Sequence, residues 1–158
     1  LRDAFKITKS PYIFFSDTGN KHSPEDFWKL YNHIDDFDLI IGVKSNRKDQ
    51  NYRKALTWGY NKLLSIIFRK KISDADSGFR IYSKDLMDAL LNEEWIFKEL
   101  VASELYLRSS IEGYKIKEVP VRYNQRKGAS KGLPISKIPK VIFKIFFDIF
   151  KLRKSYYK

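Results

Sequence analysis

Hydrophobic and polar residues form blocks of two lengths along the chain. Short apolar runs bounded by turn residues, as in buried strands, occupy 12–16, 38–43 and 79–82. Longer segments repeat their apolar residues every three or four positions, as one face of a helix does, and occupy 24–32, 52–68, 84–91, 98–112 and 135–153. Strands that alternate with helices predict an α/β layered fold with a mostly parallel sheet.

Local signals define several ends of these elements. Ser23 and Pro24 are typical of the N-cap and first position of a helix, and Gly113 is typical of a helix C-terminus. The segment 115–123 is a predicted strand, and Pro120 places it at a sheet edge because proline has no backbone N–H to donate. Ligands of such sheets bind beyond the carboxyl ends of the strands. The turn 17–20 and the loop 44–51 follow two predicted strands, so we expect the site there.

Composition agrees with a folded domain. The chain has 158 residues, of which 43% are hydrophobic and 16% aromatic, and this aromatic content argues against disorder. It has no cysteine, which excludes disulfides and thiolate metal sites. The chain begins at Leu1 rather than at Met and shows no signal peptide, and we interpret it as a piece of a longer polypeptide.

The formal charge of +12 favours a polyanionic partner: nucleic acid, anionic lipid or a phosphorylated substrate. Residues 136–158 carry seven Lys or Arg against one Asp on the most apolar stretch of the chain. Their charged residues form one narrow stripe, Lys137, Lys140, Lys144, Asp148 and Lys151. The apolar runs are shorter than the roughly 18 residues that a spanning helix needs. We therefore expect a helix that lies in an anionic membrane interface, or alternatively one that docks on the part of the longer polypeptide that is missing here.

Nucleic acid is not an expected partner. A nucleic-acid surface interleaves aromatic side chains with Lys and Arg on an exposed sheet or groove. In this chain the Phe residues cluster with apolar neighbours instead. A non-catalytic basic module that binds membranes or nucleic acid stays a remote alternative.

Three motifs carry the strongest functional signal. They are Asp74 with Ser77-Gly78-Phe79-Arg80, then Glu104, then the loop from Arg126 to Lys131, which has the pattern Arg-x-Gly-x-Ser-Lys. Their order and spacing resemble the C-terminal half of a family 2 glycosyltransferase. The resemblance is to the branch that transfers a sugar from a nucleotide sugar to a dolichyl or undecaprenyl phosphate. It covers residues 1 to about 135.

The resemblance implies a GT-A-like fold, present here as its C-terminal part only. Residues 1–134 would be this part of the catalytic domain, and 135–158 would be a basic amphipathic membrane-interface helix and tail. The resemblance also implies that the nucleotide-binding half is missing, so we expect these residues alone to be inactive and poorly soluble. We also expect a sheet edge that the rest of such an enzyme covers.

Asp17 follows the first strand, where the family usually has Asp-x-Asp with a Gln or similar group two residues further on. The resemblance implies that this acid holds a divalent metal, Mg²⁺ or Mn²⁺, against the donor diphosphate. Here the second acid is replaced by Gly19 and the amide by Lys21, which leaves metal dependence open. One hypothesis is that Lys21 supplies part of the positive charge. The alternative for Asp17 is an Asx-turn at a strand end.

The resemblance also implies that Lys44, Arg53 and Arg126 grip the acceptor phosphate, with Lys131 closing the last loop. Lys44 occupies a position that is more often Arg in the family. Lysine acts as a point charge, whereas arginine matches phosphate oxygens with a planar fork. Most of the 31 basic residues simply face water, so only the joint pattern favours these four.

Asp74, Arg80 and Glu104 complete the predicted catalytic set together with Asp17 and Lys21. Arg80 would hold a phosphate or a carboxylate, and Glu104 would either act in catalysis or pair with Arg80 or Arg126. Asp76 occupies a variable position of the family and is left out.

The implied activity is an inverting glycosyltransferase that uses a donor of the GDP-mannose or UDP-glucose type and a polyprenyl phosphate. The implied location is the cytoplasmic face of a membrane, as a peripheral protein. The alternative is a family 2 enzyme with a sugar or glycan acceptor in cell-surface polysaccharide synthesis. No Gln-x-x-Arg-Trp motif occurs, which argues against a processive synthase.

Overall fold

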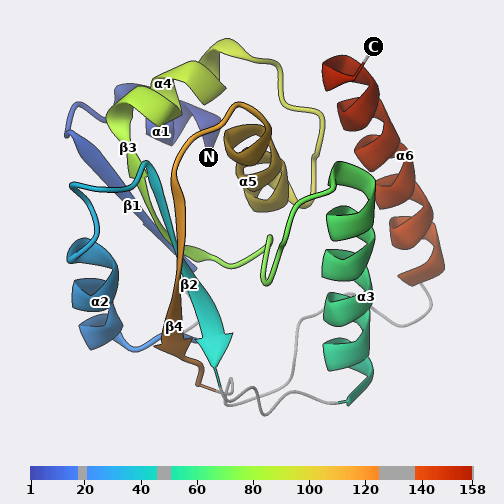
Figure 1. Ribbon diagram of the computed structural model, residues 1–158, viewed down its shortest axis with the longest axis horizontal. Helices are drawn as coiled ribbons and strands as arrows, with labels where there is room; N and C mark the ends of the chain where they lie inside the picture. Colours follow the sequence, from blue (N-terminus) through green and yellow to red (C-terminus); the bar gives the residue numbers. More distant parts are fainter. Residues whose placement is uncertain (18–20, 46–50, 125–137, 158) are drawn as a thin grey trace.

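The computed structural model describes residues 1–17, 21–45, 51–124 and 138–157. These residues fold into a four-stranded sheet with helices on both faces (Figure 1). The strands are β1 (Tyr12–Ser16), β2 (Leu39–Ser45), β3 (Phe79–Ser83) and β4 (Ile116–Arg122). The described helices are α1 (Arg2–Ile7), a 3₁₀ turn η1 (Pro24–Asp26), α2 (Phe27–Tyr31), α3 (Asn51–Phe68), α4 (Lys84–Asn92), α5 (Val101–Ile111) and α6 (Ile138–Tyr156). These elements confirm the predicted α/β class.

The strand order is β1-β3-β2-β4. Strand β3 pairs antiparallel with both β1 and β2, whereas β2 pairs parallel with β4. Three of the four strands therefore run in one direction, as predicted, but the inserted β3 makes two of the three ladders antiparallel. The carboxyl ends of β1, β2 and β4 lie at the same edge, where an isolated bridge joins His22 to Tyr123. Strand β4 is at the sheet edge, as Pro120 predicted.

Two local predictions about helix ends are also confirmed. Ser23 and Pro24 take the N-cap and the start of η1, although the Ser23 side chain makes no capping bond. Gly113, at the end of α5, has φ of +85°, a left-handed conformation that favours glycine. The cap of α4, where the Ser83 side chain accepts the Leu86 N–H at 3.3 Å, was not predicted. Helix α1 was not predicted either, because a six-residue helix with Phe5 as its one buried residue shows no periodicity.

Apolar residues on the two faces of the sheet enter two different cores. Leu39 and Ile41 of β2 face the larger core, which α3, α4, α5 and α6 complete. Ile40, between them, faces the smaller core, where it packs with Leu30 of α2. Both faces of β2 are covered, which explains its continuous apolar run. Figure 1 shows α2 on one side of the sheet and α3, α5 and α6 on the other.

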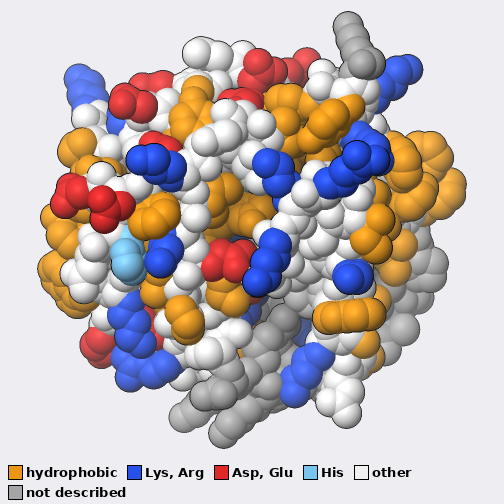
Figure 2. All heavy atoms as spheres, viewed as in Figure 1, with side chains coloured by type: hydrophobic (Ala, Val, Ile, Leu, Met, Phe, Trp, Pro, Cys, Tyr) orange, Lys and Arg blue, Asp and Glu red, His pale blue; other side chains and the backbone are white. Residues whose placement is uncertain are grey.

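Helix α6 docks on this same domain. Ile149 and Leu152 are fully buried in the larger core, and Lys144 forms a 2.8 Å ion pair with Glu99. Its other face is exposed and apolar, with Ile142, Phe143, Phe146, Phe147 and Phe150. Figure 2 shows hydrophobic side chains gathered at the edge where Figure 1 places α6. No helix in the described ranges is both long enough and apolar enough to cross a membrane.

Candidate functional site

Two ion pairs lie at the carboxyl ends of β1 and β2. Lys21 Nζ is 3.2 Å from Asp17 Oδ2, and Lys44 Nζ is 3.3 Å from Asp74 Oδ2. The backbone connects the two pairs: the Asp17 N–H donates to the Gly78 carbonyl at 2.8 Å, and the Ser77 N–H donates to the Asp74 carbonyl at 3.3 Å. We call Asp17, Lys21, Lys44 and Asp74 the strand-end charge cluster. The fold thus brings together four of the residues predicted from sequence.

Gly78 allows the Asp17 carboxyl group to lie where it does. A Cβ on Gly78 would be 2.3 Å from Asp17 Cγ, closer than any real contact. Phe79, the next residue, is buried and stacks on the His22 ring with centroids 4.8 Å apart. Gly78 thus allows a close approach of the Asp17 side chain, and Phe79 packs against His22. Glycine in this motif is therefore explained by the position of Asp17.

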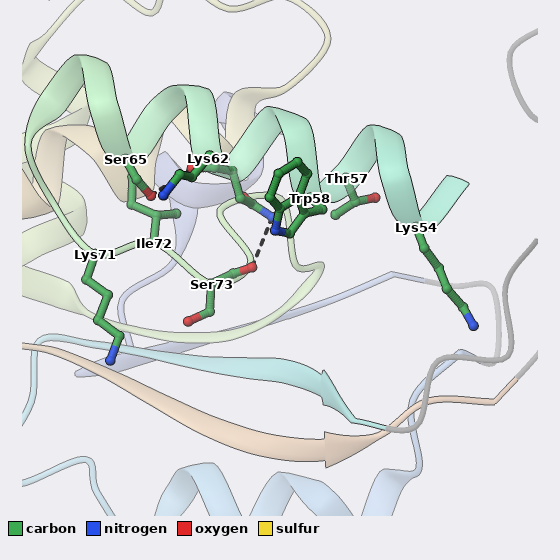
Figure 3. A pocket seen from close by; sticks show the side chains of 9 residues that line it. Lys54, Thr57, Trp58, Lys62, Ser65, Lys71, Ile72 and Ser73 are labelled. Carbon is green, nitrogen blue, oxygen red and sulfur yellow. Dashed lines mark hydrogen bonds between the residues drawn. The ribbon is translucent and has the colours of Figure 1, made fainter. Parts of the chain in front are cut away.

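The loop that carries Asp74 is held by side-chain bonds to its backbone. Asn61 on α3 donates from Nδ2 to the Ser73 carbonyl at 2.9 Å (Figure 3) and accepts the Ala75 N–H on Oδ1 at 3.1 Å. Asp74 is 4% exposed, and its Oδ1 has no hydrogen-bond partner among the described residues. Sequence reasoning missed Asn61; the available signal was a polar residue inside the apolar periodicity of α3.

His22 is buried beside the cluster. Burial first, and then the nearby Lys44 ammonium, lower the pKa of His22, so the ring is neutral at pH 7. Neither ring nitrogen has a hydrogen-bond partner in the described part of the chain. Sequence reasoning assigned no role to His22.

Arg80 is fully buried and faces away from the surface of the cluster. Its guanidinium donates to the carbonyls of Ser77, Ala75 and Ala102, the last at 2.6 Å. These bonds connect the loop before β3 to the start of α5. The predicted catalytic role of Arg80 stays a prediction, and the geometry favours an effect through the loop.

Glu104 lies on α5 with no exposed surface and accepts the backbone N–H groups of Ile96 and Phe97 at 2.6–2.9 Å. Among the described residues its ion-pair partner is Arg108, at 2.8 Å, rather than the Arg80 considered from sequence. Arg126, the other partner considered, lies outside the described residues. Burial would lower the pKa of Arg108, but its bonds to Glu104 outweigh this and raise the pKa. The i,i+4 spacing of the two residues was the signal that could have identified the pair.

Of the remaining predicted phosphate-binding residues, Arg53 is the one that lies within the described ranges. Arg53 lies in the first turn of α3, where its Nε donates to the Tyr52 hydroxyl at 3.1 Å. Arg126 and Lys131 lie outside the described residues.

Asp76 is a further acid in the Asp74 loop that the sequence analysis left out. The residue is exposed overall, but partial burial of its carboxyl group raises the pKa to about 6, against the opposing effects of Arg80 and Lys44. The signal that could have identified Asp76 was its position two residues after Asp74, which places two acids in one loop.

The residues present do not fit the two-acid metal site that the resemblance implies. Asp17 provides one carboxylate, Lys21 already pairs with it, and the second acid is replaced by Gly19. Within the described ranges, no three acidic, His or Cys side chains are arranged to hold a metal ion.

Two hollows flank α3, and neither contains the cluster. A polar groove of about 700 Å³ has Lys54, Trp58 and Lys62 of α3 on one side and Lys71 and Ser73 on the other (Figure 3). An apolar groove of about 590 Å³ separates α3 from α6; its lining residues include Leu56, Tyr60, Leu63, Ile145 and Phe146. The cluster therefore lies outside both grooves.

Sequence relatives agree with the motifs. No family model matches the chain. It is 26% identical over 125 residues to a dolichyl-phosphate hexose transferase of Haloferax volcanii, covering 77% of this chain and 54% of that protein. It is 28% identical over 131 residues to an undecaprenyl-phosphate 4-deoxy-4-formamido-L-arabinose transferase of Klebsiella pneumoniae, covering 80% of this chain and 38% of that protein. The chain spans about half the length of such relatives, or less.

The fold matches solved structures over nearly its full length. Glucosyl-3-phosphoglycerate synthase of Mycobacterium tuberculosis, in complex with phosphoglyceric acid, superposes with a TM-score of 0.67 at 12% identity. The match covers 97% of this chain and 53% of that one. A second crystal structure of that enzyme, with a TM-score of 0.63, contains Mn²⁺ and UDP. The chain is therefore related to the family 2 glycosyltransferases of the polyprenyl-phosphate type and has part of their GT-A fold.

Proposed function

We propose that these residues form the acceptor-side half of an inverting glycosyltransferase that transfers a sugar from a nucleotide sugar to a polyprenyl phosphate. The active polypeptide would be about twice this length, as the partial coverage of the relatives suggests. The observation that carries the proposal is the strand-end charge cluster, in which Lys44 of β2 and Lys21 of the segment after β1 lie at one sheet edge.

The chemistry needs charge more than it needs a base. An oxygen of the acceptor phosphate attacks the anomeric carbon from the face opposite the leaving group. The bond from that carbon to the diphosphate oxygen breaks, and the nucleoside diphosphate leaves with the electron pair. A phosphate monoester has its second pKa near 6, so it is largely a dianion at pH 7. No proton has to be removed, and alignment and charge stabilisation can carry the catalysis.

Each charged residue has a place in this scheme. Lys44 would bind the acceptor phosphate together with Arg53, Arg126 and Lys131, and Asp74 would orient the Lys44 ammonium. Asp17 and Lys21 would face the donor diphosphate. Arg80 and Glu104 would act as positioning residues, because their hydrogen bonds hold the Asp74 loop and the segment before α5.

Membrane binding would involve the outer face of α6. Phe143 is 67% exposed and contacts Phe147, and Phe146 contacts Phe150. Exposed aromatic rings beside lysines suit the interface of an anionic bilayer. A lipid-linked acceptor would then be reached from that surface.

The test uses the full polypeptide in membranes with labelled GDP-mannose or UDP-glucose and a polyprenyl phosphate. We expect an acid-labile lipid-linked sugar that is lost in Lys44→Ala and in Arg126→Ala. Lys62→Ala, which removes a lysine of the polar groove outside the strand-end charge cluster, is the matched control and should leave the product unchanged. Transfer to a glycan or to a small phosphorylated acceptor, with no lipid product, would overturn the proposed acceptor.

A further inference from the structure

We propose that the ammonium of Lys21 takes the place of the divalent cation, so that this chain binds the donor diphosphate without a metal ion. The inference rests on the proposed function, because it concerns the same site. It starts from the two departures from the family pattern, Gly19 and Lys21, and from the contact that Lys21 makes.

The charges balance without an ion. In the family pattern two carboxylates face one dication, and the local sum is zero. In this chain one carboxylate, Asp17, faces one ammonium, Lys21, and the local sum is again zero. Loss of the second acid and gain of the lysine therefore compensate each other. Either change alone would leave the site with an unbalanced charge.

The geometry disfavours a dication at Asp17. Lys21 Nζ lies 3.2 Å from Asp17 Oδ2, so an ion on this carboxylate would be within a few ångströms of a like charge. Asp17 cannot easily turn away, because its carboxyl group packs on Gly78 and its N–H is bonded to the Gly78 carbonyl. The next carboxylate of the cluster, Asp74, is already paired with Lys44.

Lys21 is accessible and keeps donors for a ligand. Its side chain is 33% exposed, and only one of its three ammonium N–H groups is needed for Asp17. The others can reach phosphate oxygens of the donor. When the bond between the anomeric carbon and the diphosphate oxygen breaks, negative charge grows on that oxygen, and a nearby ammonium stabilises it. Asp17 then orients the ammonium instead of holding a metal.

Nucleotide binding provides the test. UDP and GDP are titrated calorimetrically into the full polypeptide, once with EDTA and once with Mn²⁺. We expect the wild type to bind equally in both, and Lys21→Gln to lose roughly tenfold or more in EDTA, as expected for loss of a charged contact. Lys54→Gln makes the same change in the polar groove beside α3, outside the strand-end charge cluster, and should have no effect.

For a double variant the proposal predicts the opposite behaviour, nucleotide binding that requires a metal ion. Gly19→Asp with Lys21→Gln restores the two acids and the amide of the family, and should bind the nucleotide only with Mn²⁺. A Mn²⁺ titration followed by electron paramagnetic resonance should then detect bound ion in the double variant and not in the wild type. This readout does not depend on turnover.

The outcomes separate the two proposals. Wild-type binding and lipid product that both require Mn²⁺, with Lys21→Gln unaffected, would overturn the role of Lys21 and leave the proposed function intact. No nucleotide binding under either condition would overturn the proposed function itself. Nucleotide binding that persists in EDTA and depends on Lys21 would support both proposals.

Discussion

Two regions of the molecule contain paired charges, and they differ in what the pairs leave free. Under α5, Glu104 and Arg108 are 0% and 3% exposed, and backbone N–H groups, a carbonyl and the Tyr156 hydroxyl satisfy them. At the strand ends, the Lys21–Asp17 pair is partly exposed, and Asp74 keeps one oxygen without a partner among the described residues. The same chemistry is structural in the first region and available to a ligand in the second.

The predicted catalytic residues fall into two groups according to whether their charges are fully hydrogen-bonded or partly free. Arg80 and Glu104 share the buried, fully bonded character of the first region, whereas Asp17, Lys21 and Asp74 belong to the strand-end charge cluster. A buried charge with all its hydrogen bonds made holds backbone segments in place. A charge with free donors or acceptors can exchange its partner for a substrate. The following predictions test this division, from the largest effect to the smallest.

Breaking the buried pair should have the largest effect on stability. Arg108→Met leaves the Glu104 carboxylate buried without its cation, and the expected loss is about 3–5 kcal/mol in the free energy of unfolding. Denaturant unfolding measures it. Lys144→Gln, which breaks the exposed pair with Glu99, is the control and should change the free energy of unfolding little. Equal losses of unfolding free energy in both variants would contradict the distinction between buried structural pairs and exposed pairs.

Gly78→Ala should damage the strand-end charge cluster more than the fold. The added Cβ displaces the Asp17 carboxyl group, at an expected stability cost of about 1–3 kcal/mol. Transfer activity should fall severely because Asp17 moves. Adding Asp17→Ala should recover most of the stability and none of the activity. Retained activity in Gly78→Ala would show that the position of Asp17 is unimportant.

The raised pKa of Asp76 predicts that the stability of the protein depends on pH. Its folded-state pKa of about 6 is above the ordinary 3.8, so the folded protein binds this proton more tightly than the unfolded one. The contribution to stability is complete below pH 3.8 and is lost as the pH rises through about 6. Asp76→Asn stays neutral, so its melting temperature relative to wild type should rise between pH 4 and pH 7. A constant difference over this range would contradict the raised pKa.

The smallest effect concerns the exposed face of α6. Phe147→Ser should weaken binding to vesicles of anionic phospholipid by roughly 1 kcal/mol, because one partly inserted ring is lost. Trp28→Ser, an exposed aromatic residue on α2 across the sheet, is the control and should leave sedimentation with vesicles unchanged. Equal weakening by both variants would remove α6 from the membrane contact.

Much of the local structure followed from the sequence alone. Apolar periodicity located β1 to β4 and α2 to α6, because a buried face repeats at the period of its element. Single residues with unusual backbones, Pro120 and Gly113, identified the edge strand and a helix end. The position of Asp17 and Lys44 after two strands indicated the site, because parallel strands bring their carboxyl ends to one edge.

Only the tertiary structure decided which charges are buried and which remain accessible. Arg80 and Asp74 are six residues apart in one motif, yet the insertion of β3 between β1 and β2 turns Arg80 into the core and leaves Asp74 beside Lys44. The apolar surface of α6 likewise divides into a docked and an exposed face when Ile149 and Leu152 enter the core. Burial depends on neighbours far apart in the chain, and residue type and spacing do not contain that information.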